Sequence, residues 1–125
     1  MTDQTKSITT REPRDQSGET VPIDQRGSTA GTLYRFISTL DADVHITAEA
    51  TDDIDGDSFS ESESLPIGGE STDPDADTKL VTAGDSTTQV ESTLLTENWP
   101  WIELTITPQS TPTTGSVEVR SVKNF

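Results

Sequence analysis

The chain has 125 residues, of which 23 are acidic and 8 are basic, and its formal net charge is −15. This length suits one domain with an appendage, and this charge argues against direct binding to nucleic acid, which requires a basic surface. The absence of cysteine excludes disulfides, zinc–thiolate sites and thiol nucleophiles. No apolar run is long enough for a membrane span or a signal peptide, so we expect no contact with a membrane.

The surplus of Asp, Glu and Thr over Lys resembles the surface of proteins from extreme halophiles. At molar salt the Debye length falls to about 3 Å, and the repulsion between so many carboxylates is then screened. An ordinary acidic surface and a calcium-binding surface are the alternative interpretations.

Residues 1–28 contain two prolines and two glycines, and their few aliphatic residues follow no period of 2 or 3.6. They carry four basic and five acidic residues, whereas residues 29–125 carry four basic and 18 acidic ones. We therefore predict an extended N-terminal arm over residues 1–28 and a folded domain over residues 29–125. Because the arm is nearly neutral, it suits contact with an acidic neighbouring subunit.

The domain begins near Ala30 and consists of short alternating segments separated by turns. Period-2 alternation of apolar and polar residues predicts strands over residues 33–40, 44–50, 79–83, 87–95, 99–107 and 117–122. The acidic stretch 51–77 is rich in turn residues, and within it Phe59 and residues 65–67 are expected to anchor short strands. No segment has a helical period, so we predict an all-β fold, a small antiparallel β-sandwich or jelly roll.

Segment 99–107 is the expected centre of the core, because Ile102, Leu104 and Ile106 share one face of the strand while Trp101 is out of phase with them. In segment 87–95, Val90 is the clearest candidate for an inward residue.

Segment 33–40 has apolar residues on both faces. Tyr34 and Phe36 lie on one side, and Leu33 and Ile37 lie on the other side together with Arg35. This pattern predicts a strand that is covered twice, by the core and by a partner or the arm.

The sequence Asp53-Ile54-Asp55-Gly56-Asp57 places alternating carboxylates around a glycine, as calcium loops do. An EF-hand requires its glycine after the third acid and a glutamate at the twelfth position, where this chain has Ser64. Asp53, Asp55 and Asp57 are therefore weak metal candidates, and we predict a solvated loop with no metal and no cofactor.

No nucleophile elbow, phosphate-binding loop or dinucleotide fingerprint is present. His45, the single histidine, lies on the polar face of its strand, and we predict no catalytic residue and no enzyme. The aromatic residues Trp99, Trp101, Tyr34 and Phe36 could form a carbohydrate platform, but core or subunit contacts are the favoured interpretation.

The layout of residues 30–123 carries a resemblance. An acidic Asp-Gly turn and an aromatic residue follow a strand at residues 49–59, a tryptophan strand ends in Thr-Ile-Thr-Pro at residues 105–108, and residues 113–119 read Thr-Thr-Gly-Ser-Val-Glu-Val. This layout resembles the small β-sandwich accessory proteins of tailed-virus particles, which are capsid decoration, turret or tail subunits.

The resemblance implies a non-enzymatic structural virion protein, made in the host cytoplasm and placed on the particle as a capsid decoration or minor capsid (cement or turret) subunit. With the acidic composition it implies a virus of a halophilic archaeon. Its expected partners are the major capsid protein or other virion subunits, together with further copies of itself.

The arm would latch a neighbouring subunit. The expected interface residues are Lys6, Ile8, Arg11, Arg14, Val21, Ile23, Tyr34 and Phe36. A tail or baseplate subunit is one alternative, and a carbohydrate- or calcium-dependent surface-binding module is the other.

Overall fold

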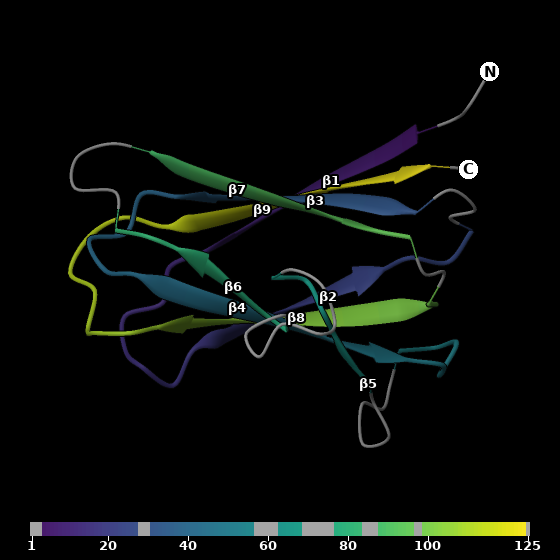
Figure 1. The fold of residues 1–125 in the computed structure, drawn as a ribbon, viewed down its shortest axis with the longest axis horizontal. Helices are drawn as coiled ribbons and strands as arrows, with labels where there is room; N and C mark the ends of the chain where they lie inside the picture. The colour runs from purple at the N-terminus through teal and green to yellow at the C-terminus, as the bar shows by residue number, and fades with distance from the viewer. Residues whose placement is uncertain are drawn as a thin grey trace.

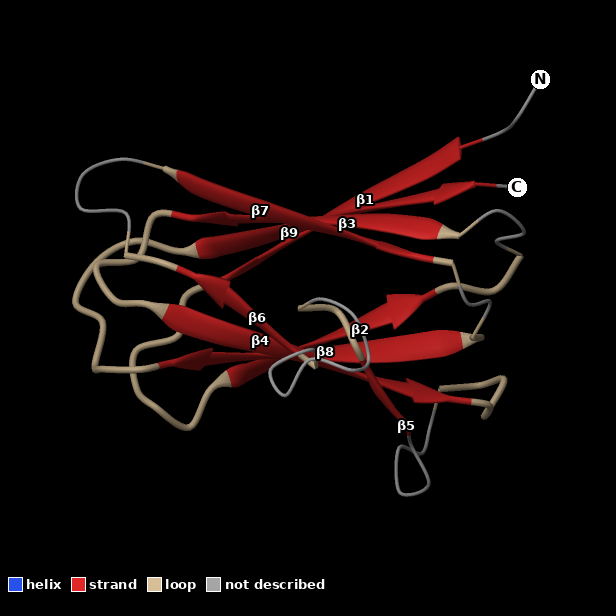
Figure 2. Cartoon of the chain, viewed as in Figure 1, coloured by secondary structure: helices blue, strands red, loops and turns tan. Residues whose placement is uncertain are grey.

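The computed structural model describes residues 4–27, 31–56, 63–68, 77–83, 88–96 and 99–124, and every helix or strand within these ranges is a β-strand (Figure 2). In chain order the strands are β1 (Gln4–Arg11), β2 (Glu19–Asp24), β3 (Thr32–Ser38), β4 (Val44–Thr51), β5 (Glu63–Leu65), β6 (Thr78–Val81), β7 (Gln89–Leu95), β8 (Trp101–Pro108) and β9 (Val117–Asn124). The described part of the chain offers no helix long and apolar enough to span a membrane.

The strands form two antiparallel sheets that stack face to face (Figure 1). The four-stranded sheet has the order β1-β9-β3-β7, and the five-stranded sheet has the order β2-β8-β4-β5, with β6 also pairing with β4. Apart from the β4–β5–β6 segment, the chain changes sheet between each strand and the next. Two Greek keys wound in this way make a jelly roll, which confirms the predicted fold class.

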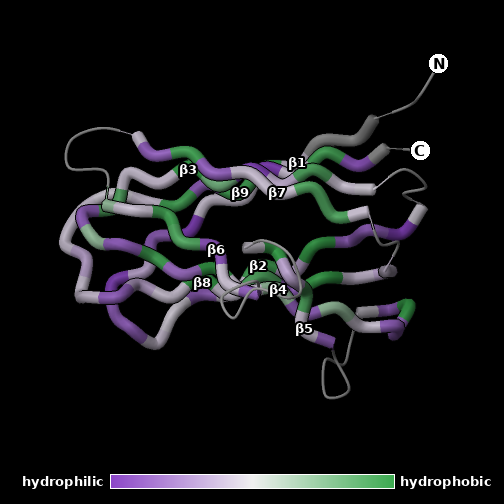
Figure 3. Tube along the Cα trace, in the orientation of Figure 1, coloured by the Kyte–Doolittle hydropathy of each residue, from purple (hydrophilic) through white to green (hydrophobic). Residues whose placement is uncertain are grey.

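The core fills the space between the sheets, because apolar residues alternate with polar ones along the strands (Figure 3). β8 lies between β2 and β4, and its residues Ile102, Leu104 and Ile106 are fully buried, as predicted. Leu65 and Ile67 are also buried and anchor the described part of the acidic stretch, whereas Phe59 and Asp57 lie outside the described residues.

Tyr34 and Phe36 of β3 point into this core and are fully buried. The Tyr34 hydroxyl accepts a hydrogen bond from Gln25 Nε2, which is buried as well. Burial raises the pKa of Tyr34. The prediction that Tyr34 and Phe36 are interface residues is therefore wrong, because the chain's own core encloses both rings.

The predicted arm is also wrong for residues 4–24, which supply a strand to each sheet. β1 pairs with β9 along its whole length, and β2 pairs with β8. Val21 and Ile23 of β2 are 1% and 7% exposed and belong to the core, so they are not available to a neighbouring subunit. The domain boundary expected at residues 28–29 consequently does not separate an arm from a sandwich.

β7 has the opposite orientation to the one predicted. Its register with β3 turns Val90 outward, where 48% of it is exposed, while Leu95 is buried. The inward side of β7 is polar instead: Thr93 Oγ1 donates to the Ile67 carbonyl at 2.7 Å, and Glu91 forms an ion pair with Lys79 at 3.9 Å.

Candidate subunit interface

The outer face of the four-stranded sheet combines apolar and basic side chains. We call it the arginine face. The cross-strand registers align its residues in three rows: Val122-Leu33-Leu94, Ile8-Arg120-Arg35-Ser92 and Thr10-Glu118-Ile37-Val90. No element of the described chain covers these rows, because β1, which was expected to cover them as an arm, is itself a strand of the same sheet.

Four large apolar side chains on this face are well exposed: Ile8 at 62%, Leu33 at 41%, Val90 at 48% and Leu94 at 58%. Single exposed apolar residues are normal on protein surfaces. Here, however, four of the six large exposed apolar residues found in the described chain share one sheet face. Of these, Leu33 and Leu94 stand directly opposite each other, and Ile8 and Val90 lie in the two neighbouring rows. Exposed apolar residues that share a face with polar neighbours are a feature of surfaces that bind a partner or a ligand.

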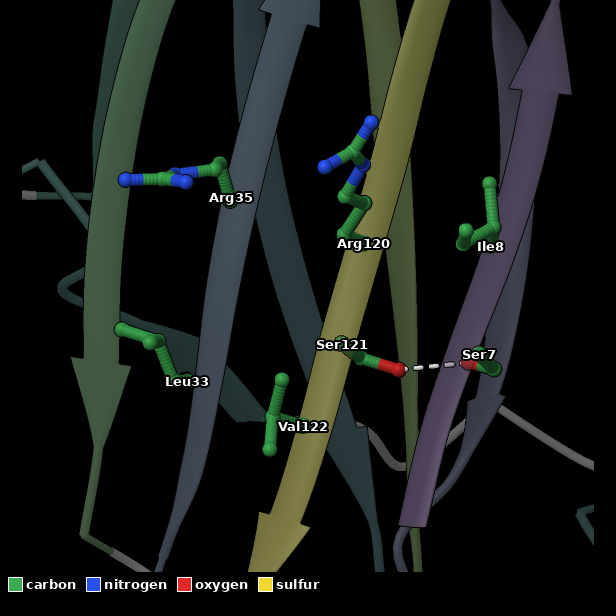
Figure 4. Close-up of a pocket in the computed structure, with 7 residues that line it drawn as sticks. All are labelled: Ser7, Ile8, Leu33, Arg35, Arg120, Ser121 and Val122. Carbon is green, nitrogen blue, oxygen red and sulfur yellow. Dashed lines mark hydrogen bonds between the residues drawn. The ribbon is translucent and has the colours of Figure 1, made fainter.

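Two arginines lie in the middle of this face. Arg35 of β3 stands directly opposite Arg120 of β9, and such like-charged pairs destabilise a sheet. Arg120 makes a 3.4 Å contact with Glu118, whereas Arg35 has no hydrogen bond or ion pair with any other described residue. Figure 4 shows the two side chains leaving the sheet in different directions, Arg35 toward β7.

A hollow of about 440 Å³ lies among these side chains (Figure 4). Its lining residues come from β1, β3 and β9: Ser7, Ile8, Leu33, Arg35, Arg120, Ser121 and Val122. The Ser7 and Ser121 hydroxyls hydrogen-bond each other at 2.6 Å and tie β1 to β9 beneath it. The hollow thus offers apolar walls beside two guanidinium groups, which suits an acidic partner that also carries apolar groups.

The outer face of the five-stranded sheet has the opposite chemistry, and we call it the glutamate face. Glu49 of β4 stands directly opposite Glu103 of β8, and Thr47 stands opposite Thr105 in the next row. Asp24 is also on this face, where Arg26 binds its carboxylate and lies over the Trp101 ring, and the strand positions that the structure describes on this face carry no lysine or arginine. One outer face therefore carries an arginine pair, with Glu118 in the neighbouring row, and the opposite outer face carries a glutamate pair.

The structure separates the remaining predicted interface residues. Ile8 is on the arginine face, and the backbone of Lys6 stands opposite Val122 at its edge. Arg11 Nε donates to the Thr20 carbonyl at 3.2 Å, and Arg14 Nη2 donates to the Gly115 carbonyl at 2.8 Å. Both arginines thus stabilise their own chain near the β1–β2 connection, and their predicted contact with a neighbour stays a prediction.

The candidate calcium loop is stabilised by its own backbone. Asp53 Oδ1 accepts a hydrogen bond from the Asp55 amide at 3.1 Å, and the Gly56 amide donates to the Asp53 carbonyl at 3.1 Å. No group of three or more acidic or histidine residues within the described ranges is placed to hold a metal ion. The described part of this turn is accounted for by an ordinary Asx turn.

The tryptophans are used by the chain itself. Trp101 Nε1 donates to the Ile54 carbonyl at 3.0 Å, and the Arg26 guanidinium lies 5.3 Å from the ring centroid. Arg26 also donates to both carboxylate oxygens of Asp24, which lowers the pKa of Asp24. Because Trp99 packs against the core as well, these rings do not assemble into an open carbohydrate platform.

His45 lies half-buried on the glutamate face, opposite Thr107 and Leu80. Its strand neighbours alternate between core and surface as the sequence predicts, so its position is that of an ordinary polar-face residue.

No protein-family model matches the chain, and no curated protein matches it. Among solved structures, the SPBc2 prophage-derived protein YomS aligns with a TM-score of 0.52 at 14% identity, over 98% of this chain and 96% of YomS. The PBSX exported protein XepA aligns with a TM-score of 0.51 at 15% identity, over 98% of this chain and 38% of XepA. The enzymatically active domain of tailspike protein 4 of bacteriophage CBA120 aligns with a TM-score of 0.53 at 10% identity, over all of this chain and 19% of the tailspike chain. At these identities the likeness shows a shared fold.

Sequence reasoning missed the arginine face. One signal pointed toward it, namely the apolar residues on both sides of segment 33–40, which predicted a second covering for β3. The outward side chains of β7 and the arginine pair could not be recognised without the strand order.

Proposed function

We propose that this chain is a non-enzymatic structural subunit of a virus particle, and that the arginine face is the surface by which it joins its neighbours. The observation that carries the proposal is this uncovered face, with four well-exposed apolar side chains around an arginine pair. Isolated proteins gain nothing from such a surface, because it exposes apolar area and brings like charges together.

The kind of assembly is suggested by the proteins that share the fold. YomS is prophage-derived, XepA is an exported protein of PBSX, and the CBA120 protein is a tailspike. These descriptions support a place in a tailed-virus particle, either as a capsid decoration, cement or turret subunit or as a tail or baseplate subunit. The acidic surface would keep the copies apart until they are concentrated on the particle.

The test is incorporation of tagged copies into particles. Cells that produce the particles are supplied with tagged wild type, with Arg35→Glu/Arg120→Glu, or with Arg11→Glu/Arg14→Glu, which makes the same change in net charge near the β1–β2 connection. We expect the wild type and the second variant to be found in purified particles and the first variant to be lost.

Localisation of the tag by electron microscopy separates capsid from tail. Absence of the wild-type chain from purified particles would refute the proposed function. Loss of the Arg11/Arg14 variant alone, when circular dichroism shows that variant to be folded, would move the interface to the predicted N-terminal residues.

A further inference from the structure

We propose that the partner of the arginine face is the glutamate face of a second copy of this chain, so that copies stack head to tail. The inference rests on the proposed function in taking the arginine face as the assembly surface, and it adds the identity of the partner. It follows from the charge, spacing and position of residues on the two outer faces.

The two faces carry matching charge pairs. Arg35 and Arg120 occupy directly opposite positions on β3 and β9, and Glu49 and Glu103 occupy directly opposite positions on β4 and β8. Residues opposite each other in antiparallel strands have their Cα atoms about 4.5–5.5 Å apart. The backbone positions of the two pairs are therefore similarly spaced, and the long arginine side chains can reach the carboxylates when the strands of the two faces are aligned.

Docking improves the energetics of the arginine pair. In the isolated chain Arg35 and Arg120 occupy directly opposite positions, Arg120 contacts Glu118, and within the described residues Arg35 has no charged or hydrogen-bonding partner. A carboxylate of a second copy would give Arg35 a charge-assisted hydrogen bond, which is about twice as strong as a neutral one.

The neighbouring rows fit as well. Leu33 and Val122 form the row beside the arginine pair, and Thr47 and Thr105 form the row beside the glutamate pair. Threonine offers a methyl group to an apolar neighbour while its hydroxyl stays hydrated, so the side chains of the Leu33 row can be covered without placing a charge against them.

A symmetric contact is disfavoured by the same charges. Two arginine faces in contact would bring four guanidinium groups together, and two glutamate faces would bring four carboxylates together. A head-to-tail contact avoids both. Because the two faces lie on opposite sides of the sandwich, each added copy presents the surface that the next copy needs, and the contact can repeat into a stack.

The contact between one pair of copies is weak. Four strands about 4.8 Å apart and about seven residues long, at about 3.3 Å per residue, give a face of roughly 440 Å². Stable complexes bury about 800 Å² per partner. We therefore expect a monomer in dilute solution and stacking at high protein concentration or on a particle that holds many copies.

The experiment is sedimentation velocity on the full chain over a range of protein concentrations at fixed salt. The wild type should show a weight-average mass that rises with concentration. Arg35→Glu/Arg120→Glu makes both faces acidic, Glu49→Arg/Glu103→Arg makes both faces basic, and each variant alone should stay monomeric.

An equimolar mixture of these two variants should associate again, because every contact between unlike copies pairs an acidic face with a basic one. The variant with all four substitutions should regain self-association, since its two faces have simply exchanged charge. Arg35→Gln/Arg120→Gln, which adds no new charge, should weaken association. It replaces the arginine reversal in the test if circular dichroism shows that a charge-reversed variant does not fold.

Two controls match the change in net charge. Arg11→Glu/Arg14→Glu equals the arginine reversal in net charge, and Glu12→Arg/Glu63→Arg equals the glutamate reversal. All four control residues lie outside the central rows of both faces, so both controls, with folding checked by circular dichroism because Arg11 and Arg14 bind backbone carbonyls of their own chain, should associate as the wild type does.

A wild type that stays monomeric at every concentration would overturn the inference, as would a mixture of the two reversed variants that does not associate. Self-association that survives Glu49→Arg/Glu103→Arg would instead indicate a symmetric contact and would also overturn it. The proposed function has a separate readout. Incorporation into particles through the arginine face without stacking in solution leaves the function standing, and stacking without incorporation leaves the inference standing.

Discussion

Two isoleucines in the N-terminal segment provide a direct test of where the folded domain begins. Ile8 is in β1 and Ile23 is in β2, and the sequence alone assigns both to an arm that would contact a neighbour. In the structure Ile8 is 62% exposed on the arginine face, whereas Ile23 is 7% exposed and packs in the core. The same substitution, Ile→Ala, should therefore have different effects at the two positions.

The size of each effect follows from burial. Replacing a buried isoleucine by alanine costs about 2–5 kcal/mol, through lost transfer free energy and the cavity that remains. Since β2 is the edge strand of its sheet and the surroundings can partly relax, we expect about 2–3 kcal/mol for Ile23→Ala. Ile8→Ala removes an exposed side chain from an edge strand, where only β-propensity is lost, and should cost less than about 1 kcal/mol.

The assay is urea unfolding of each variant at fixed salt, followed by tryptophan fluorescence and circular dichroism. The free energy of unfolding comes from the midpoint and the slope, and an unchanged slope shows that the same surface unfolds. A domain of this size has about 5–15 kcal/mol of stability in total, so the Ile23 effect is readily measured. Equal and small effects at both positions would refute the placement of β2 in the core and restore the arm.

Four further predictions follow from the described residues. Gly56→Ala should lower the free energy of unfolding by roughly 1–3 kcal/mol and change tryptophan emission. The reason is that Gly56 has φ +71° and an added Cβ would lie 2.6 Å from the Trp101 ring. Unchanged stability and emission would contradict this packing. Raising salt from about 0.1 M to molar KCl should raise the melting temperature, because screening weakens the repulsion of a chain with a net charge of −15, and a flat response would count against halophilic adaptation. Chelation by EDTA at constant salt should leave the melting temperature unchanged, since a metal held by Asp53 and Asp55 in the folded state would stabilise it. Burial raises the pKa of Tyr34, so its hydroxyl is deprotonated in the unfolded chain at a lower pH than in the folded chain. The free energy of unfolding should therefore fall as the pH rises above about 10. In the Tyr34→Phe variant this contribution to the alkaline loss of stability should be absent.

The strands that could be predicted are those with one face fully in the core. β4 and β8 lie side by side in the middle of their sheet, and each has a buried residue at every second position. Such positions tolerate only apolar side chains, because a polar one would lose its hydration without a partner. The alternation in the sequence is therefore continuous, and it predicted both strands and their inward faces.

The edge strands could not be predicted in the same way. β1 pairs over eight residues through its backbone, yet its described side chains at Ser7, Ile8, Thr9, Thr10 and Arg11 supply nothing to the core cluster. A strand held by backbone hydrogen bonds carries no apolar signature, so it has the composition of an extended arm. The orientation of β7 was predicted wrongly for a related reason. Polar residues on its inward side have polar partners, and Val90 and Leu94 face outward.

The candidate interface depends on strand order, which local sequence does not contain. Arg35 and Arg120 are far apart in the chain and meet only because β3 pairs with β9, and Glu49 and Glu103 meet only because β4 pairs with β8. A sandwich needs apolar residues on its two inner faces and sets no such demand on its outer faces. The chemistry of the outer faces is therefore free to serve another purpose. Although acids outnumber bases by 23 to 8, an arginine pair stands among exposed aliphatic side chains on one face, and a glutamate pair stands at the matching place on the other. Both pairs lie outside the core that holds the sheets together, and they are complementary in charge. In the proposed stack, a second copy of the chain uses both surfaces in one repeated contact.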